Sequence, residues 1–282
     1  MHVHTVHSGF CNIPLLNSIC RESYTRPEEL YTKLKRTGMS LVTVTDHDSI
    51  DAVECLRRYP DFFMSEEVTC TLPSGASMHV GVYDIDDRQH MEVQRRRDDI
   101  ASLAAYLREQ RLLFTANHLF SSLTGRRELA DFDVFAREFE AFEILNGCML
   151  LTANRNAMEL ARLQGKTGIG GSDAHTLFTS GSCWTEVRGA RTKAQFLEGI
   201  RLGQASVWGE SGSFLRLTRD ILEIGLSMVR SRPVTAPVAL LAALVPAVTL
   251  INYCMEKRFS RVWADRLNLN VAIRAIAEEV AA

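Results

Sequence analysis

Short apolar runs alternate with amphipathic stretches along most of the chain. The runs are rich in β-branched and other strand-forming residues, and they lie at 41–45, 65–70, 78–83, 112–116, 142–145, 167–171, 184–187 and 205–208. Between them, apolar residues recur at helical spacing, as at Ile100, Leu103 and Leu107, and predict helices near 27–36, 50–58, 91–111, 132–139, 153–164 and 193–202. This alternation predicts a parallel α/β fold, and about seven or eight such units close most naturally as a barrel.

Two shorter signals mark boundaries. Thr25-Arg26-Pro27-Glu28 has the composition of a helix start, with Thr25 as the N-cap, Glu28 completing a capping box and proline in the first turn. Residues 209–213, with the sequence GESGS, predict a linker rather than a phosphate-binding loop.

The C-terminal part of the chain has a different pattern. An amphipathic helix is predicted after residue 213, and residues 233–255 then contain no charged residue. A helix of that length reaches roughly 35 Å, enough to cross a bilayer core. Basic residues flank the run on both sides, and Pro237 and Pro246 interrupt it. The run therefore fits either a membrane-associated segment or a buried or dimer-forming helical hairpin broken at Pro246.

Composition excludes several classes of protein. The 282 residues carry a net charge of −2, so there is no general basic surface for nucleic acid. The seven cysteines are scattered and form no CxxC pair, which indicates a reducing compartment and a cytoplasmic protein. No signal peptide opens the sequence, and only Met1 precedes His2. We therefore expect either a truncated first strand or a translation start further upstream.

Histidine and acidic residues gather where the predicted strands end. His2 and His4 alternate on the first stretch, and similar residues lie at or near the ends of five other strands: Asp46 and His47, Glu67, His79, His118, and Asp173 with His175. Strand ends of an α/β barrel meet at one face. Burying so many titratable groups together costs several kcal/mol apiece unless they bind a metal. The pattern therefore predicts a metal cluster.

These stretches resemble the PHP family (polymerase and histidinol phosphatase) of metal-dependent phosphoesterases. The matching pieces cover about residues 2–208 and are His2-Val3-His4-Thr5 with Ser8, Thr45-Asp46-His47-Asp48, Glu67-Val68-Thr69-Cys70, His79, Asn117-His118, Glu143-Ile144-Leu145-Asn146 and Gly171-Ser172-Asp173-Ala174-His175. The resemblance implies a distorted (β/α)7 TIM-like barrel over residues 1–210, followed by a helical tail over 211–282.

The resemblance also implies two or three divalent ions, chosen from Zn, Mn, Mg and Fe. One ion would be held by His2, His4, Glu67 and Asp173, a second by His47 and His175, and a third by His79 and His118 with Glu67 bridging. Asp46 is expected to orient its neighbours. The chain departs from the family after Ser8, where Gly9 and Phe10 replace an expected ligand. His7 or a residue of the loop 9–23 is the candidate replacement.

The expected activity is hydrolysis of a phosphate ester on a small metabolite or nucleotide. Divalent ions neutralise phosphoryl oxygens and activate water, and His175 or His118 is the expected proton donor. Arg126 and Arg127 are candidate contacts for substrate phosphate. Two alternatives stay open: a metal-dependent C–N or acyl hydrolase on a similar barrel, and a non-catalytic metal-stabilised module anchored by its tail. Residues 233–255 are the candidate contact with a membrane or a second copy of the chain.

Overall fold

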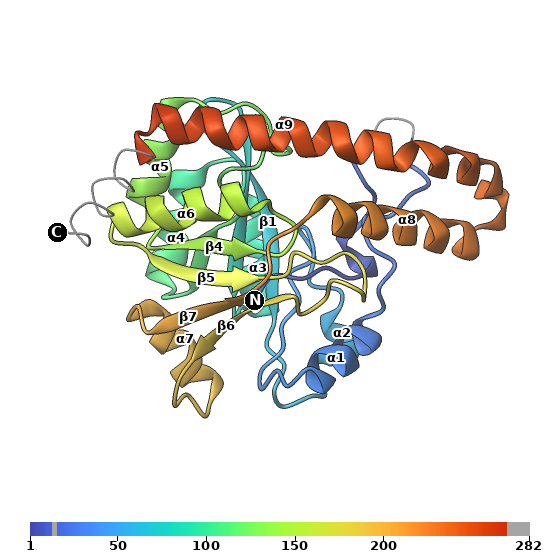
Figure 1. The fold of residues 1–282 in the computed structure, drawn as a ribbon. Helices are drawn as coiled ribbons and strands as arrows, with labels where there is room; N and C mark the ends of the chain where they lie inside the picture. The colour runs from blue at the N-terminus through green and yellow to red at the C-terminus, as the bar shows by residue number, and fades with distance from the viewer. Residues whose placement is uncertain (13–15, 270–282) are drawn as a thin grey trace.

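The computed structural model describes residues 1–12 and 16–269 and shows a mixed α/β fold with a helical C-terminal segment (Figure 1). The strands are β1 (Ser65–Thr71), β2 (Ser77–Tyr83), β3 (Leu113–Ala116), β4 (Ala141–Asn146), β5 (Thr167–Gly171), β6 (Cys183–Val187) and β7 (Ala205–Gly209). The helices are η1 (Val6–Ser8), α1 (Pro27–Arg36), α2 (Val53–Leu56), α3 (Asp87–Arg96), α4 (Ile100–Glu109), α5 (Leu129–Glu138), α6 (Leu151–Leu163), α7 (Lys193–Arg201), α8 (Phe214–Ser231), η2 (Pro233–Leu244) and α9 (Val245–Arg266).

The central sheet has five strands in the order β1-β2-β3-β4-β5. β3, β4 and β5 are parallel, whereas β2 is antiparallel to both of its neighbours. The expected all-parallel arrangement is therefore wrong for β1 and β2. Only a tight turn separates them, and a parallel pair needs a crossover of a dozen or more residues. β6 and β7 form a separate antiparallel pair.

Among the described residues, the five strands of the central sheet form an open sheet, and they do not form the predicted closed barrel. Extended segments lie between β5 and β1 instead. Val3 bridges Ala174 beyond β5, and the Thr45 amide donates to the Val3 carbonyl over 2.9 Å. His47 in turn bridges Glu67 of β1. The predicted strand 41–45 makes a single bridge, from Val42 to Phe62, rather than a ladder, and His47 follows it at the sheet edge.

Two helix predictions are corrected by capping contacts. The predicted helix 91–111 is two helices, because Asp99 interrupts it and accepts hydrogen bonds from Ala101 N and Ser102 N at the start of α4. The N-cap of α1 is Arg26, without a side-chain cap, and not Thr25. The Thr25 hydroxyl instead donates to the His175 carbonyl over 3.5 Å, so it ties α1 to the end of β5.

The main core lies between the sheet and helices α3 to α6, and aromatic rings such as Phe135, Phe139 and Phe142 are completely buried in it. The C-terminal segment contributes to the same core. Trp263 of α9 is 3% exposed, and its ring lies 4.9 Å from the Phe132 ring, measured between centroids. The second half of α9 is therefore an integral part of the domain.

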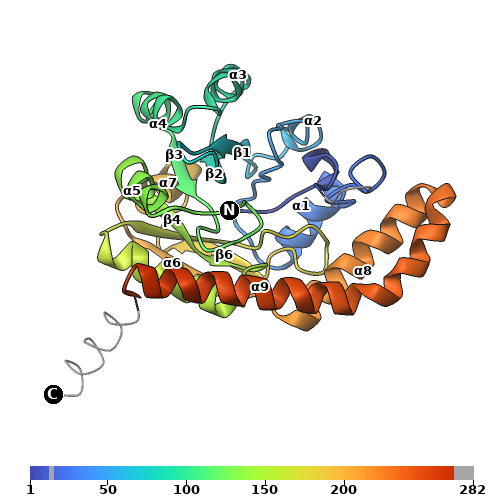
Figure 2. The same ribbon diagram turned by 90° about the horizontal axis from the view of Figure 1, so that it is seen from above.

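The helices α8, η2 and α9 form a long hairpin whose far end extends beyond the sheet, as both views show (Figures 1 and 2). One helix-rich stretch of the described chain, Pro233–Arg266, is long and apolar enough to cross a membrane, with a mean hydropathy of 2.3 and 11% of its most apolar window buried. The segment 209–213, expected to be a linker, packs against the body: Asn154 donates to Ser211 Oγ, and Ser213 caps α8.

Candidate metal centre

The predicted site residues converge at one edge of the sheet. They come from the N-terminal segment, from β1, from β2 and from the turns that follow β3 and β5, and they are His2, His4, His47, Glu67, His79, His118, Asp173 and His175. The histidine of β2 reaches this edge from the opposite direction, because β2 is antiparallel: His79 lies near the amino end of its strand. Four overlapping groups of these residues have ligand atoms within 4.8 Å of one another.

Glu67 lies at the centre of the cluster and is completely buried. Its Oε2 atom is 3.1 Å from His2 Nε2 and 3.3 Å from His47 Nδ1, and its Oε1 atom is 3.2 Å from His118 Nε2. Asn117 donates a further hydrogen bond to Oε1 over 2.8 Å. Both oxygens of one carboxylate therefore face different histidines, which allows Glu67 to bridge two ions.

The hydrogen bonds around His2 and His4 direct their lone pairs at the same point. His2 Nδ1 lies 2.8 Å from a Glu143 carboxylate oxygen, which can only accept. His4 Nδ1 lies 2.9 Å from the Ser8 hydroxyl, whose proton is given to Asp46. When both imidazoles are neutral, as metal-binding histidines are, these partners keep the protons on Nδ1 and leave the two Nε2 atoms, which are 3.0 Å apart, free to bind a metal ion.

Two carboxylates complete this arrangement. His4 Nε2 is 3.2 Å from Asp173 Oδ1 and 3.4 Å from Glu67 Oε2, and Glu67 Oε2 has no hydrogen-bond partner among the described residues. Two imidazole nitrogens and two carboxylate oxygens crowded together in a buried space form the donor set of a divalent cation. The residues present therefore fit a metal ion.

A second layer of hydrogen bonds holds the ligands in place. Asn146 donates from Nδ2 to Glu143 over 2.8 Å and to Asp173 Oδ2 over 3.0 Å. Asp46 accepts from the Thr5 amide, the Thr5 hydroxyl and the Ser8 hydroxyl. Partners of this kind fix the orientation and tautomer of metal-binding side chains.

Two of the candidate ligands have strained backbones. His118 and Asp173 have φ values of 30° and 49°, in the left-handed region that residues other than glycine seldom adopt. Strain of this kind clusters at functional sites. Gly171 is required for a different reason, because a Cβ atom at this position would lie 2.3 Å from His2 Cβ. Only glycine allows the N-terminal segment to pack this closely against β5.

A second group forms around His47 and His175. The His4 ring stacks on both, with centroid distances of 4.6 Å and 4.3 Å. Glu22, a residue that the sequence did not single out, places Oε2 3.3 Å from His47 Nε2. That oxygen has no hydrogen-bond partner in the described part of the chain. Glu22 is therefore an unpaired carboxylate directed at the second group.

The position of Glu22 accounts for the departure after Ser8. The Glu22 amide donates to the Gly9 carbonyl over 3.2 Å, and Phe10 pairs with Arg21 in an antiparallel bridge. The loop therefore folds back and brings Glu22 beside the position where the family's acidic residue is missing. Glu22 lies in the loop 9–23, where a replacement ligand was expected, but the local pattern does not show which residue of that loop faces His47.

Burial and charge shift the pKa values of the cluster in opposite directions. Burial is the largest effect on His4, but hydrogen bonds to Asp173 and Glu67 outweigh it and raise the pKa of His4 to about 9. Burial dominates for His79 and His175, and it lowers the pKa of each to about 4. Burial also raises the pKa of the Glu22 carboxyl to about 7. The outer histidines are thus neutral and able to act as ligands.

The remaining predicted residues lie elsewhere. Arg127 is buried and donates to the Ser77 carbonyl and the Thr124 hydroxyl, whereas Arg126 is exposed. His7 belongs to none of the groups of described residues that could hold a metal. His90 lies outside these groups as well, and its Nδ1 atom is 2.9 Å from Glu66 Oε2.

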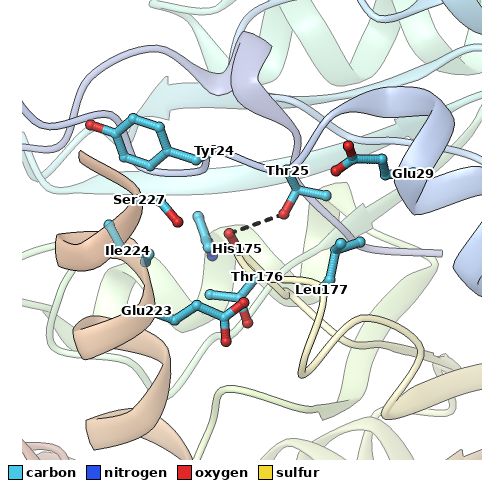
Figure 3. A pocket seen from close by; sticks show the side chains of 9 residues that line it. All are labelled: Tyr24, Thr25, Glu29, His175, Thr176, Leu177, Glu223, Ile224 and Ser227. Atoms are coloured by element: carbon cyan, nitrogen blue, oxygen red, sulfur yellow. Dashed lines mark hydrogen bonds between the residues drawn. The ribbon is translucent and has the colours of Figure 1, made fainter. Parts of the chain in front are cut away.

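A half-open pocket of about 120 Å³ lies beside His175 (Figure 3). Its wall is formed by the start of α1, the segment 175–177 and one face of α8, and its lining residues are Tyr24, Thr25, Glu29, His175, Thr176, Leu177, Glu223, Ile224 and Ser227. Glu29 and Glu223 are its charged residues, so the pocket is acidic.

A family model described as PHP-associated matches residues 152–205. Among solved structures, the fold is similar to a two-domain protein from Bacteroides vulgatus that contains a predicted PHP-like metal-dependent phosphoesterase, with a TM-score of 0.59 and 14% identity over 74% of this chain. The chain spans 63% of the length of that protein.

It is also similar to PsfC from Pseudomonas syringae, with a TM-score of 0.55 and 19% identity over 81% of this chain and 96% of PsfC. No curated protein sequence matches. The matched segment at 152–205 and the shared fold make this chain similar to PHP-type proteins.

Proposed function

We propose that this chain is a metal-dependent phosphoesterase that hydrolyses a phosphate ester with two or three divalent ions. The observation that carries the proposal is the pair of Nε2 lone pairs of His2 and His4, which face each other at 3.0 Å beside the buried carboxylates of Glu67 and Asp173. Four electron-rich atoms in one dry space repel each other unless a cation lies between them. We also take the incomplete ring of strands and extended segments as the distorted PHP-type barrel.

Each ion has a distinct group of residues. The first would be held by His2, His4, Glu67 and Asp173, the second by His47 and His175 with Glu22, and the third by His79, His118 and the other oxygen of Glu67. Zinc and manganese are the metals proposed first, because imidazole and carboxylate together suit both. When bound, the ions supply positive charge for the phosphoryl oxygens and lower the pKa of water.

The proton for the leaving oxygen is assigned to His118 rather than His175. Burial opposes protonation of His118, but the hydrogen bond to Glu67 outweighs burial and raises the pKa of His118. The pKa of His175 is lowered to about 4, mainly by burial. His118 is therefore the better proton carrier when the third ion is absent, and it would be a ligand when that ion is bound; His175 is the better ligand throughout.

The acidic pocket beside His175 favours one kind of substrate. Glu29 and Glu223 repel a second phosphate and attract an amine or hydroxyl-bearing group. We propose that the non-phosphate part of a small substrate occupies this pocket. The guanidinium of Arg127 is already engaged by backbone and hydroxyl oxygens, so Arg126 is the better placed of the two arginines for contact with solvent-borne phosphate. The cytoplasm stays the proposed location of the reaction.

The experiment is reconstitution with manganese or zinc followed by a screen of p-nitrophenyl phosphate, mononucleotides and amine-bearing phosphomonoesters. Asp173→Asn should lower kcat by on the order of 100-fold or more, because it removes a charged ligand while keeping its shape. Asp133→Asn, an exposed position on α5, is the matched control.

Two experimental outcomes would contradict the phosphoesterase proposal. A protein that binds metal stoichiometrically, cleaves none of the esters and instead hydrolyses amides or lactams would replace this proposal with the C–N hydrolase alternative. Binding of metal with no hydrolysis of either class would leave the non-catalytic module.

A further inference from the structure

At the end of the helical hairpin, apolar side chains face outward and polar ones are buried. All residues from 233 to 255 are described, and the two that are buried are threonines, Thr235 and Thr249. The large apolar side chains of the same stretch face outward: Leu240 is 82% exposed, Leu244 is 56% exposed and Ile251 is 62% exposed. A water-soluble helix has the opposite arrangement, with its apolar face inward.

The apolar surface surrounds the hairpin end and extends onto the neighbouring helix. Leu222 and Leu226 of α8 are exposed as well. A groove-binding or dimerising helix presents one apolar stripe and keeps its other face polar. Residues 233–255 have no charged residue on any face, so a single protein partner would leave much of this surface in water.

Cations border the apolar surface on both sides. Arg230 and Arg232 precede it, and Lys257, Arg258 and Arg261 follow it. The acidic residue at this border, Glu256, is buried and accepts hydrogen bonds from the Ser122 amide and hydroxyl. Apolar side chains ringed by basic ones match the acyl region and the anionic headgroups of a lipid surface. Two copies of the chain joined at this surface would instead bring their cations together.

The second half of α9 cannot follow the apolar stretch across a bilayer while the domain keeps this fold. Ser260 is held by Asn156 over 2.8 Å, and Trp263 lies in the main core. The hairpin therefore lies on one leaflet and does not span the membrane. We propose that residues 233–255 form a membrane-binding tip that inserts into the surface of a bilayer containing anionic lipid.

The tip is connected to the metal site through α8. Glu223, Ile224 and Ser227 of this helix line the pocket beside His175, and Arg230 lies two helical turns beyond Glu223, about 10 Å along the axis. Binding at the tip therefore brings the α8 residues that line the pocket close to the lipid surface. This proposal does not depend on the phosphoesterase activity.

The test is flotation of the full-length protein with vesicles of phosphatidylcholine, with or without phosphatidylglycerol. We expect the protein to float with the anionic vesicles and to be released as salt is raised. The double variant Leu240→Glu/Leu244→Glu should lower the bound fraction at least about tenfold, because charge at the tip opposes insertion. Leu202→Glu is the matched control, because Leu202 is also a leucine, is 62% exposed and lies at the end of α7, outside the tip.

A second variant, Arg230→Glu/Arg258→Glu, tests the charge border and should abolish the preference for phosphatidylglycerol. Circular dichroism and sedimentation velocity are run on every variant. Wild-type protein that floats with neither vesicle overturns the proposal, as does equal flotation of the tip variant and wild type. A wild-type dimer that the tip variant dissociates, without vesicle binding, assigns the surface to a second copy of the chain and also overturns it.

Discussion

At the scale of single residues, the site depends on carboxylates that have no partner of their own. Glu67 Oε2 and Glu22 Oε2 are both buried and lack hydrogen-bond partners among the described residues. A buried polar atom without a partner usually costs on the order of 1–3 kcal/mol. Such atoms persist in a fold when a ligand satisfies them, and here each one faces a histidine nitrogen.

Glu22→Gln tests whether this residue completes the second group. The substitution keeps the shape of the side chain but removes its charge, so manganese binding at the weakest site should fall at least about tenfold while the tightest site is unchanged. Isothermal titration calorimetry with manganese, together with elemental analysis, measures both. Glu54→Gln, an exposed position, is the control. Unaltered stoichiometry and affinity in Glu22→Gln would exclude the residue as a ligand.

At the scale of secondary structure, capping and packing decide what the hydrophobic pattern leaves open. Asp99 divides one predicted helix into two, and a tight turn makes β1 and β2 antiparallel. The tail shows the same effect. Its second helix begins as an exposed apolar segment and ends as a core element, with Ser260 and Trp263 buried.

Trp263→Ala tests how firmly α9 is attached. Removing a buried tryptophan that packs on Phe132 leaves a cavity, and we expect the free energy of unfolding to fall by about 3–5 kcal/mol. Val262→Ala, at a 39% exposed neighbouring position, should cost less than about 1 kcal/mol. Urea denaturation followed by fluorescence measures the difference. Similar losses in the two variants would mean that α9 is not anchored through this ring.

At the scale of the whole molecule, the candidate metal site connects the two edges of the open sheet. The ligands come from both ends of the sheet and from the N-terminal segment that bridges them. A cation would therefore hold together elements that otherwise meet through single bridges, and binding to the native state alone raises stability by mass action.

The stability of the metal-free protein should depend on pH through His4. Its pKa is raised from 6.5 to about 9 in the fold, where burial is outweighed by Asp173 and Glu67. A group with a raised pKa in the folded state stabilises that state fully below pH 6.5 and progressively less as pH rises through about 9. We expect the chelated protein to lose on the order of 3 kcal/mol, or several degrees in Tm, over this range.

The metal-loaded protein provides the comparison. Its histidines are held as neutral ligands, so its Tm should change much less between pH 6.5 and 9. Thermal unfolding of both forms in the same buffers measures this difference. A metal-free protein whose Tm is constant over the range would show that His4 is not protonated in the fold.

Much of the site could be predicted from sequence because its residues follow apolar runs directly. His2 with His4, His47, His118 and Asp173 with His175 each stand where a strand or extended segment ends, and local pattern alone locates such ends. Glu67 and His79, expected at carboxyl ends of strands, lie near the amino ends of β1 and β2 instead. The structure brings all of them to one edge. The α/β class and the helical tail follow from the same alternation of apolar and polar positions.

Other features depend on contacts that no local pattern encodes. Glu22 reaches His47 because the loop after Ser8 folds back on itself, with Phe10 paired to Arg21. The supporting roles of Glu143 and Asn146 likewise exist only through distant partners. The antiparallel course of β2 and the bridges that stand in for a closed ladder also depend on the assembled sheet.

The tail separates the two kinds of information most clearly. Sequence alone determined that residues 233–255 are apolar and uncharged, because that is a property of the side chains themselves. Tertiary structure decided which of these side chains face water. Polar Thr249 turns toward the body and Ile251 turns away, because the buried contacts of Glu256, Ser260 and Trp263 fix the rotation of α9. The hydrophobicity of a side chain is set by its own chemistry, whereas its exposure depends on which residues pack against it, and these are determined by the tertiary structure.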